Sequence, residues 1–295
     1  MSLSAEKRRT RWADAGLLYA AVIWGSTFFI VKDALAGIDP IVMVAYRFLL
    51  AGGILLVYLL IRKSPPARGW GRALFLSVIL WALYVSQTVG LKYTSASNSG
   101  FITGLFVLFT PLFLLTLFKR KPTVMEAVAS GVSLAGLWTL TGGLSDVNLG
   151  DSLTLIAAMT YALHVLYSDR YMKAGVDPYQ ISCQQFLLVG VMSLITALVF
   201  DLPLDIGTAR VAGIVVFLAL APTLSAFVIQ MLAQRFTAPV KVTLIFALEP
   251  VFAALFAWTL GDESIVPHRA LGGLLIVIAL ALAGIKLPGD RTAQG

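Results

Sequence analysis

The chain has 295 residues, of which 59% are hydrophobic and 13% are charged, and its mean hydropathy is +0.88. This composition departs from that of soluble globular domains and is typical of a protein embedded in lipid. A net charge of +7 would suggest a nucleic-acid partner in a soluble protein, but in a membrane protein the basic residues first report topology. The single cysteine, Cys183, excludes an internal disulfide framework and offers no zinc pattern.

Several long segments contain no Asp, Glu, Lys or Arg, among them residues 73–91, 93–118 and 178–200. Each approaches or exceeds the ~20 residues that a helix needs to cross a bilayer core. Clusters of Pro, Gly and charged residues separate the segments. We therefore predict an all-α integral membrane protein with ten transmembrane helices, at about residues 13–34, 40–61, 72–91, 97–118, 124–142, 151–172, 178–200, 211–233, 239–260 and 267–286.

The Lys and Arg residues lie mainly on one side of these predicted helices. Of the 22, two fall inside helices (Arg47 and Lys241), sixteen fall on the side of the N-terminus, Arg68, Lys286 and Arg291 among them, and four fall on the other side: Lys32, Lys92, Arg210 and Arg269. Cytoplasmic segments of membrane proteins carry the excess of Lys and Arg. We therefore predict that both termini are cytoplasmic and that the chain binds membrane lipid and no nucleic acid.

The sequence contains an internal repeat, because DPIVMVAYRFLLAG at 39–52 returns as DPYQISCQQFLLVG at 177–190. The two segments open the second and the seventh predicted helix, so five helices separate them. An odd number of crossings gives homologous halves opposite orientations in the membrane. The repeat therefore predicts two inverted-topology halves of five helices, residues 1–145 and 146–295, an arrangement typical of transporters with alternating access.

Pro111 and Pro250 form a pair in the fourth and the ninth predicted helices. Proline removes a backbone hydrogen bond and kinks or breaks a helix, and paired breaks in two halves point to a binding site. We interpret the pair as hinges or cavity walls, with a simple packing kink as the alternative for either residue. Gly100 and Gly104 form a GxxxG face suited to close helix packing.

Four ionisable residues fall inside the predicted helices: Arg47, His164, Lys241 and Glu249. Such residues cost roughly 2.5–3.5 kcal/mol at a helix centre on insertion scales, so they normally face protein or water. Glu249 is a candidate to take up a proton or a cationic group, or to satisfy backbone donors freed at Pro250. His164 is a second candidate for proton coupling, with plain hydrogen bonding as the alternative. Lys241 is expected to anchor the cytoplasmic end of its helix.

Arg47 stands where the second copy of the repeat has Gln185. Glutamine donates hydrogen bonds but carries no charge, so the role that both copies share is polar bonding between helices. We therefore expect a structural or gating Arg47, bonded to carbonyls of a broken neighbouring helix. Contact of its charge with a substrate is the alternative.

Aromatic and neutral polar residues recur along the predicted helices. A cavity lined by them would hold amphipathic or aromatic small molecules by stacking and a few hydrogen bonds, although each such residue can instead pack or contact the membrane interface. The candidate cavity residues are Trp24, Thr27, Phe28, Tyr84, Gln87, Asn98, Phe101, Thr103, Tyr161, His164 and Gln230.

Enzymatic motifs are missing from the sequence, which has no HExxH, no GxSxG, no Walker motif and no paired membrane aspartates. Intramembrane proteolysis and ATP-driven pumping therefore lack their reactive groups. We predict a protein that is not an enzyme and has no catalytic residues, metal site or cofactor.

Four segments carry a resemblance: WGSTF at 24–28, RFLLA at 47–51, the stretch from Lys92 to Pro111, and LEPVFAA at 248–254. Together they resemble the EamA family of the drug/metabolite transporter superfamily, in its ten-helix duplicated form, over essentially the whole chain. The resemblance implies a bacterial inner-membrane carrier with a central cavity between the first, third, fourth, sixth, eighth and ninth helices. It places the family's motifs at Trp24, Arg47, Pro111, Glu249 and Pro250.

The resemblance implies an exporter of amino acids or related metabolites, and with the repeat and the candidate cavity residues it leads us to expect a secondary transporter that exports amino acids, aromatic or hydrophobic ones among them, and related metabolites by alternating access. Protons are a candidate coupling ion. A broad multidrug or nucleotide-sugar carrier is the alternative within transport, and a non-transporting receptor or scaffold is the alternative outside it. The membrane glutamate that related small multidrug exporters carry near the start of the first helix is missing here, where only Asp14 occurs.

Overall fold

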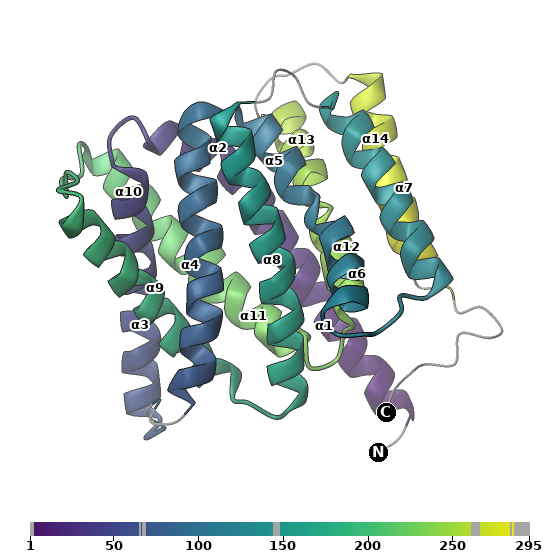
Figure 1. The fold of residues 1–295 in the computed structure, drawn as a ribbon, viewed down its shortest axis with the longest axis horizontal. Coiled ribbons are helices and arrows are strands. Elements are labelled where there is room, and N and C mark those ends of the chain that lie inside the picture. The colour runs from purple at the N-terminus through teal and green to yellow at the C-terminus, as the bar shows by residue number, and fades with distance from the viewer. Residues whose placement is uncertain are drawn as a thin grey trace.

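A computed structural model describes residues 3–64, 66, 69–143, 148–260, 266–283 and 285. The predicted boundary between the two halves, at 145/146, lies outside these residues, as do Arg68, Lys286 and Arg291 of the charge count. In the described part of the chain every regular element is helical (Figure 1). The elements are α1 (Leu3–Gly25), α2 (Thr27–Ala34), α3 (Pro40–Ile61), α4 (Trp70–Tyr93), α5 (Ala96–Gly104), α6 (Phe106–Thr116), α7 (Val124–Thr141), α8 (Leu149–Lys173), α9 (Pro178–Val199), α10 (Ala209–Leu218), the π-helix η1 (Ala219–Ser225), α11 (Ala226–Ala233), α12 (Pro239–Phe246), α13 (Glu249–Leu260) and α14 (Pro267–Ala283).

The predicted all-α membrane fold is confirmed. Over the described ranges, nine helical segments have the length and apolar composition to cross a membrane, and the tenth apolar helix, α14, has 17 residues. At 1.5 Å per residue, α14 still covers ~25 Å of the bilayer core. The predicted boundaries agree within a few residues except at the N-terminus, where α1 begins at Leu3 and not near residue 13. The third predicted helix, for example, is observed as α4, Trp70–Tyr93.

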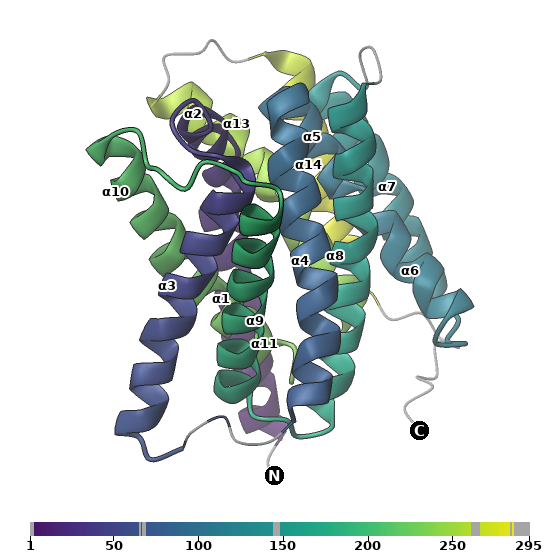
Figure 2. The ribbon, with the colours of Figure 1, turned by 60° about the vertical axis from the view of Figure 1, so that its left-hand side comes forward.

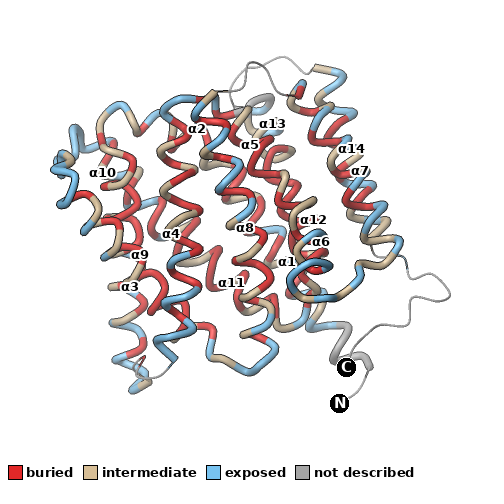
Figure 3. The backbone as a smooth tube through the Cα atoms, in the orientation of Figure 1, coloured by how far each residue is buried: buried red, intermediate tan, exposed pale blue. Residues whose placement is uncertain are grey.

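The pattern of burial is that of a helix bundle: buried residues face neighbouring helices, and exposed residues cover the outer faces (Figure 3). Many of the exposed side chains are large and apolar, such as Val57, Leu60, Leu198 and Val199. In water such a surface would be an association site. On a bundle of membrane-crossing helices it is the surface that contacts lipid.

The two repeat segments begin their helices in the same way. Asp39 caps α3 by accepting a hydrogen bond from Ile41 N at 2.8 Å, and Asp177 caps α9 by accepting one from Gln180 N at 2.8 Å. In both helices proline occupies the first turn, where its missing N–H costs nothing. The Asp-Pro pair is therefore a helix start in both copies.

Helices α3 and α9 pack side by side through reciprocal contacts (Figure 2). A Cβ built on Gly52 would lie 3.0 Å from Leu187 N, and a Cβ built on Gly190 would lie 2.8 Å from Leu49 N. Since the contact partner moves back along α9 as the position moves forward along α3, the helices are antiparallel. Glycine at both positions is what permits this close backbone approach.

Helix interruptions gather near the centre of the bundle. The first crossing is interrupted at Ser26, the fourth at Leu105, and the ninth at Ala247 and Leu248, while the eighth changes to the π-helix η1 around Pro222. A Cβ on Gly25 would lie 2.5 Å from the Glu249 carbonyl oxygen, so the breaks in the first and the ninth crossing touch each other. Pro250 stands directly after its break, whereas Pro111 lies inside α6, beyond the break at Leu105.

We predict that Gly190→Ala lowers stability, because the added methyl must push Leu49 and its backbone away from α9. Overpacking of this kind costs about 1–3 kcal/mol. Thermal unfolding in detergent measures the effect. The control is Gly53→Ala on α3, where no heavy atom of the described residues lies within 4 Å of the new Cβ. Equal unfolding temperatures for the two variants would contradict the close α3–α9 contact.

Candidate functional site

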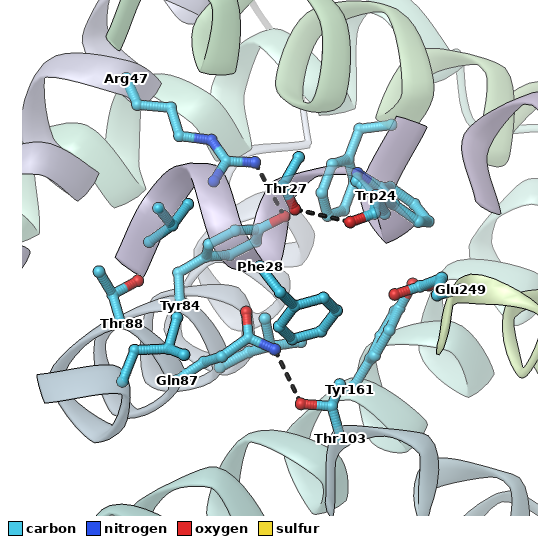
Figure 4. A pocket seen from close by; sticks show the side chains of 14 residues that line it. Trp24, Thr27, Phe28, Arg47, Tyr84, Gln87, Thr88, Thr103, Tyr161 and Glu249 are labelled. Atoms are coloured by element: carbon cyan, nitrogen blue, oxygen red, sulfur yellow. Dashed lines mark hydrogen bonds between the residues drawn. The ribbon is translucent and has the colours of Figure 1, made fainter. Parts of the chain in front are cut away.

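A cavity lies where the interrupted helices meet (Figure 4). Its volume is about 40 Å³, which is room for a few water molecules. The wall combines aromatic, hydroxyl, amide and charged side chains from seven of the ten crossings. The lining residues are Trp24, Thr27, Phe28, Val31, Arg47, Leu83, Tyr84, Gln87, Thr88, Leu91, Thr103, Tyr161, Phe227 and Glu249.

Trp24 forms the aromatic centre of this wall. Its ring makes edge contacts with Tyr161, Phe227 and Phe246, at centroid distances of 6.2, 5.2 and 4.9 Å. Edge-to-face pairs of this kind add about 0.5–1.5 kcal/mol each beyond the area they bury. The cluster therefore holds the wall together across the first, sixth, eighth and ninth crossings.

The π-helix η1 is bonded to the same tryptophan. Trp24 Nε1 donates a hydrogen bond of 2.8 Å to the carbonyl oxygen of Pro222, which lies in the middle of η1. The Thr223 hydroxyl of η1 donates to the carbonyl of Leu218, the last residue of α10, at 2.7 Å. A membrane interior has no water to bond the carbonyl groups that an irregular helix leaves free, so the indole and the hydroxyl group act as their hydrogen-bond donors.

Arg47 is 5% exposed and reaches the cavity from α3. Its Nε donates to the Thr223 hydroxyl, its Nη2 donates to the Tyr84 hydroxyl at 3.3 Å, and its guanidinium lies 4.6 Å from the centre of the Tyr84 ring. No described carboxylate lies within 4.0 Å of it. The expected bonding to a broken neighbour is present, but through hydroxyl groups and not carbonyls, and the positive charge has no ionic partner there.

Glu249 is 4% exposed and lies at another part of the same wall, at the start of α13. Its Oε1 is buried and has no hydrogen-bond partner among the described atoms. Figure 4 shows the carboxyl group and the Arg47 guanidinium on different sides of the labelled group. The cavity thus holds one guanidinium and one carboxyl group that do not pair with each other.

Neutral polar groups complete the wall. Gln87 Nε2 donates to the Thr103 hydroxyl at 2.9 Å, which joins the third crossing to the fourth. Thr27 Oγ1 donates to the Trp24 carbonyl at 2.7 Å and so satisfies backbone next to the interruption at Ser26. Gln87, Thr103 and Thr27 thus add neutral hydrogen-bonding groups to the wall.

The structure brings together nine residues named from the sequence: Trp24, Thr27, Phe28, Arg47, Tyr84, Gln87, Thr103, Tyr161 and Glu249. Others lie away from this cavity. His164 is buried and bonded to Gln185 Oε1 at 2.8 Å, Gln230 bonds Gln234 at 3.3 Å, Phe101 packs against Trp138, and Asn98 lies in the first turn of α5. Pro111 lies in α6, and Pro250 lines a neighbouring cavity.

Five lining residues escaped the sequence interpretation: Val31, Leu83, Thr88, Leu91 and Phe227. Thr88 and Leu91 follow Tyr84 and Gln87 at helical spacing, so the face of the third helix would have pointed to them. Phe227 carries no comparable signal, because apolar residues surround it in sequence.

Lys241 has an ionic partner that the sequence interpretation did not name. Its Nζ lies 2.6 Å from Asp14 Oδ2, so the ion pair joins α12 to α1. Both side chains are about one-third exposed, which limits the stabilisation that such a pair gives. The contact nevertheless ties the N-terminal part of the first crossing to the start of the ninth.

A bundle of membrane-crossing helices whose interruptions surround a central polar cavity is the architecture of a secondary transporter. Comparison with known proteins narrows this class. The sequence profile of the EamA-like transporter family matches the chain twice, at residues 11–142 and 148–285. The chain belongs to the EamA-like transporter family.

Similar proteins match more than nine-tenths of the chain. An uncharacterised transporter of Archaeoglobus fulgidus is 30% identical over 293 residues, which is 96% of this chain and 89% of that protein. The uncharacterised inner membrane transporter YedA of Escherichia coli is 29% identical over 281 residues, 91% of this chain and 90% of YedA. A solved crystal structure with 19% identity superposes with a TM-score of 0.79 over 92% of this chain and 96% of its own, which supports the fold.

We predict that Trp24→Phe destabilises the protein, because the Pro222 carbonyl loses its donor inside the membrane. Leaving a buried polar group unsatisfied costs about 1–3 kcal/mol. The matched control is Trp81→Phe, since the Trp81 Nε1 is buried with no partner among the described residues and the ring change is the same. Unfolding midpoints in detergent compare the two. A larger loss for Trp81→Phe would refute the role given to Trp24.

Proposed function

We propose that the chain is a secondary transporter that exports amino acids, aromatic or hydrophobic ones among them, and related metabolites by alternating access. The observation that carries this proposal is the cavity in which Arg47 and Glu249 are both buried without bonding each other. An isolated buried charge is costly, and a ligand that brings the opposite charge removes that cost. A zwitterion brings both.

The chemistry of each charged residue fits one end of an amino acid. A guanidinium binds carboxylate through directed, charge-assisted hydrogen bonds, and a carboxylate accepts hydrogen bonds from an ammonium group. A nucleotide sugar would bring two phosphate charges to a site with one arginine and one glutamate, and a lipophilic cation would meet Arg47. The charge balance of the wall therefore favours a dipolar molecule without net charge.

Alternating access requires that the cavity open to each side of the membrane in turn. The proposed halves, residues 1–145 and 146–295, would exchange conformations about the reciprocal α3–α9 contact. Interruptions at Ser26 and at Ala247 and Leu248 provide points where helices can bend without losing whole turns. With a volume of about 40 Å³ the cavity is contracted, so binding an amino acid requires movement of these segments.

We place the transporter in a bacterial inner membrane with both termini in the cytoplasm. The excess of basic residues on the N-terminal side supports the orientation, and the name of YedA, an inner membrane transporter, supports the location. Export is the proposed direction, with small-molecule substrate and protons as the exchanged species.

Glu249 is the group that we propose for proton exchange. Its carboxyl lines the cavity, whereas His164 is bonded to Gln185 outside it. A carboxyl group that binds either a proton or the ammonium group of a substrate, and not both, would couple the two fluxes.

The proposal predicts counterflow of labelled amino acids in proteoliposomes that contain the purified protein, with faster flux under a pH gradient. The panel contains amino acids, a nucleotide sugar and lipophilic cations, and protein-free liposomes give the background. Amino-acid flux alone supports the proposal. Flux restricted to cations or nucleotide sugars supports the alternative carriers, and no flux of any solute by folded protein supports the receptor or scaffold alternative.

The same assay tests the coupling residue. Glu249→Gln keeps the shape of the side chain but cannot lose a proton, so the stimulation by the pH gradient should disappear. His164→Ala should retain it. Stimulation that survives in Glu249→Gln would remove Glu249 from the coupling mechanism while leaving amino-acid transport intact.

Arg47→Gln copies the residue of the second repeat and separates charge from hydrogen bonding. If the guanidinium holds the substrate carboxylate, kcat/KM should fall about 10- to 100-fold, the equivalent of one lost charge-assisted hydrogen bond. Thr223→Val is the control, since it removes an internal partner of Arg47 and leaves the charge. Transport by Arg47→Gln at the rate of the unmodified protein would assign Arg47 to helix-to-helix bonding alone.

A further inference from the structure

A second cavity lies beside the first, between α2, α5, α7, α13 and α14. Its volume is about 150 Å³. Most of its wall is apolar, and Thr141 and Arg269 are the polar members. The residues that matter most for its shape are Phe28, Gly100, Leu140, Pro250, Ala253 and Ala254.

The two cavities share a wall. Phe28 lines both, and Glu249 of the first cavity is followed in the chain by Pro250 of the second. In Figure 4 the Phe28 ring lies in the middle of the labelled residues, between Gln87 and Tyr161. One aromatic side chain, carried by the eight-residue helix α2 that follows the interruption at Ser26, is therefore part of the wall of both cavities.

We infer that the second cavity receives the side chain of the transported amino acid while Arg47 and Glu249 hold its charged groups, and that Phe28 is the partition that moves aside. This inference rests on the proposed function and adds what that function leaves open, namely which amino acids fit and which residues select them.

The size of the second cavity agrees with this role. An apolar cavity of about 150 Å³ in another protein stays dry and takes up benzene. The second cavity therefore fits a phenyl ring or the branched side chain of leucine, and the indole of tryptophan exceeds it unless Phe28 yields more space.

Small residues create the space. Gly100 was expected to form a packing face with Gly104, but the two glycines differ. A Cβ on Gly104 would lie 3.0 Å from Leu137, whereas a Cβ on Gly100 meets no heavy atom of the described residues within 4 Å. Gly100 thus faces open space in the cavity wall, and Ala253 and Ala254 form part of the same wall from α13. Larger residues at these positions would fill the second cavity and leave the first cavity, with Arg47 and Glu249, unchanged.

Gly100→Val tests the inference in the proteoliposome assay, with phenylalanine, leucine, alanine and serine as substrates. One methylene in an apolar pocket changes kcat/KM about 10- to 200-fold, so the ratio of phenylalanine to alanine should fall at least tenfold. Gly131→Val on α7 is the matched control, because its Cβ also meets no heavy atom of the described chain within 4 Å and the residue lines neither cavity. Alanine flux in each variant reports folding.

Two further variants make the result independent of any one substitution. Ala254→Leu should reduce the phenylalanine-to-alanine ratio in the same way as Gly100→Val. Phe28→Ala, which removes the partition, should raise the ratio of tryptophan to alanine at least tenfold.

An equal fall for all four substrates in both pocket variants would overturn the side-chain pocket and make the second cavity part of a common path. Transport of alanine and serine by the unmodified protein, with no transport of phenylalanine or leucine, would also overturn it. In the first case the proposed function stands in full; in the second, amino-acid export stands but its extension to aromatic and hydrophobic amino acids does not. Absence of amino-acid flux in the unmodified protein would instead be the failure of the proposed function.

Discussion

Backbone hydrogen bonding in lipid is the constraint on which this structure depends. A bilayer core offers no water to bond free N–H and C=O groups, so an interrupted helix is tolerated where protein surrounds it. Here the interruptions of the first, eighth and ninth crossings meet one another, and the indole of Trp24 bonds the Pro222 carbonyl. Trp24 therefore satisfies a free backbone carbonyl and also lines the cavity.

Much of the fold could be predicted from the sequence because membrane helices are governed by local composition. The apolar runs gave the helices, and the Asp-Pro pairs gave the starts of α3 and α9. Features that arise when helices approach one another were harder to predict. The interruption at Ser26 has no proline, Pro111 lies within a regular helix, and Phe227 is one of many apolar residues in its crossing. Gly100 and Gly104 share a sequence motif, yet their surroundings differ because one faces a helix and the other a cavity.

Symmetry and asymmetry serve different parts of the molecule. The contact between α3 and α9 is reciprocal, with Gly52 against Leu187 and Gly190 against Leu49. At the cavity the correspondence ends. Arg47 of the first half has Gln185 as its counterpart, and Gln185 bonds His164. Glu249 precedes Pro250, whereas Thr110 precedes the corresponding Pro111. The Thr110 hydroxyl donates a hydrogen bond to the Phe106 carbonyl of its own helix.

The cavity wall has one guanidinium and one carboxyl group, and this has a consequence for how such a site can arise by duplication. Under the proposed division into two halves, identical copies would present each ionisable residue twice, so a site with one of each requires that the copies differ at these two positions. Fusion of the halves into one chain permits this divergence, since each copy then mutates independently while the α3–α9 contact stays the same in both.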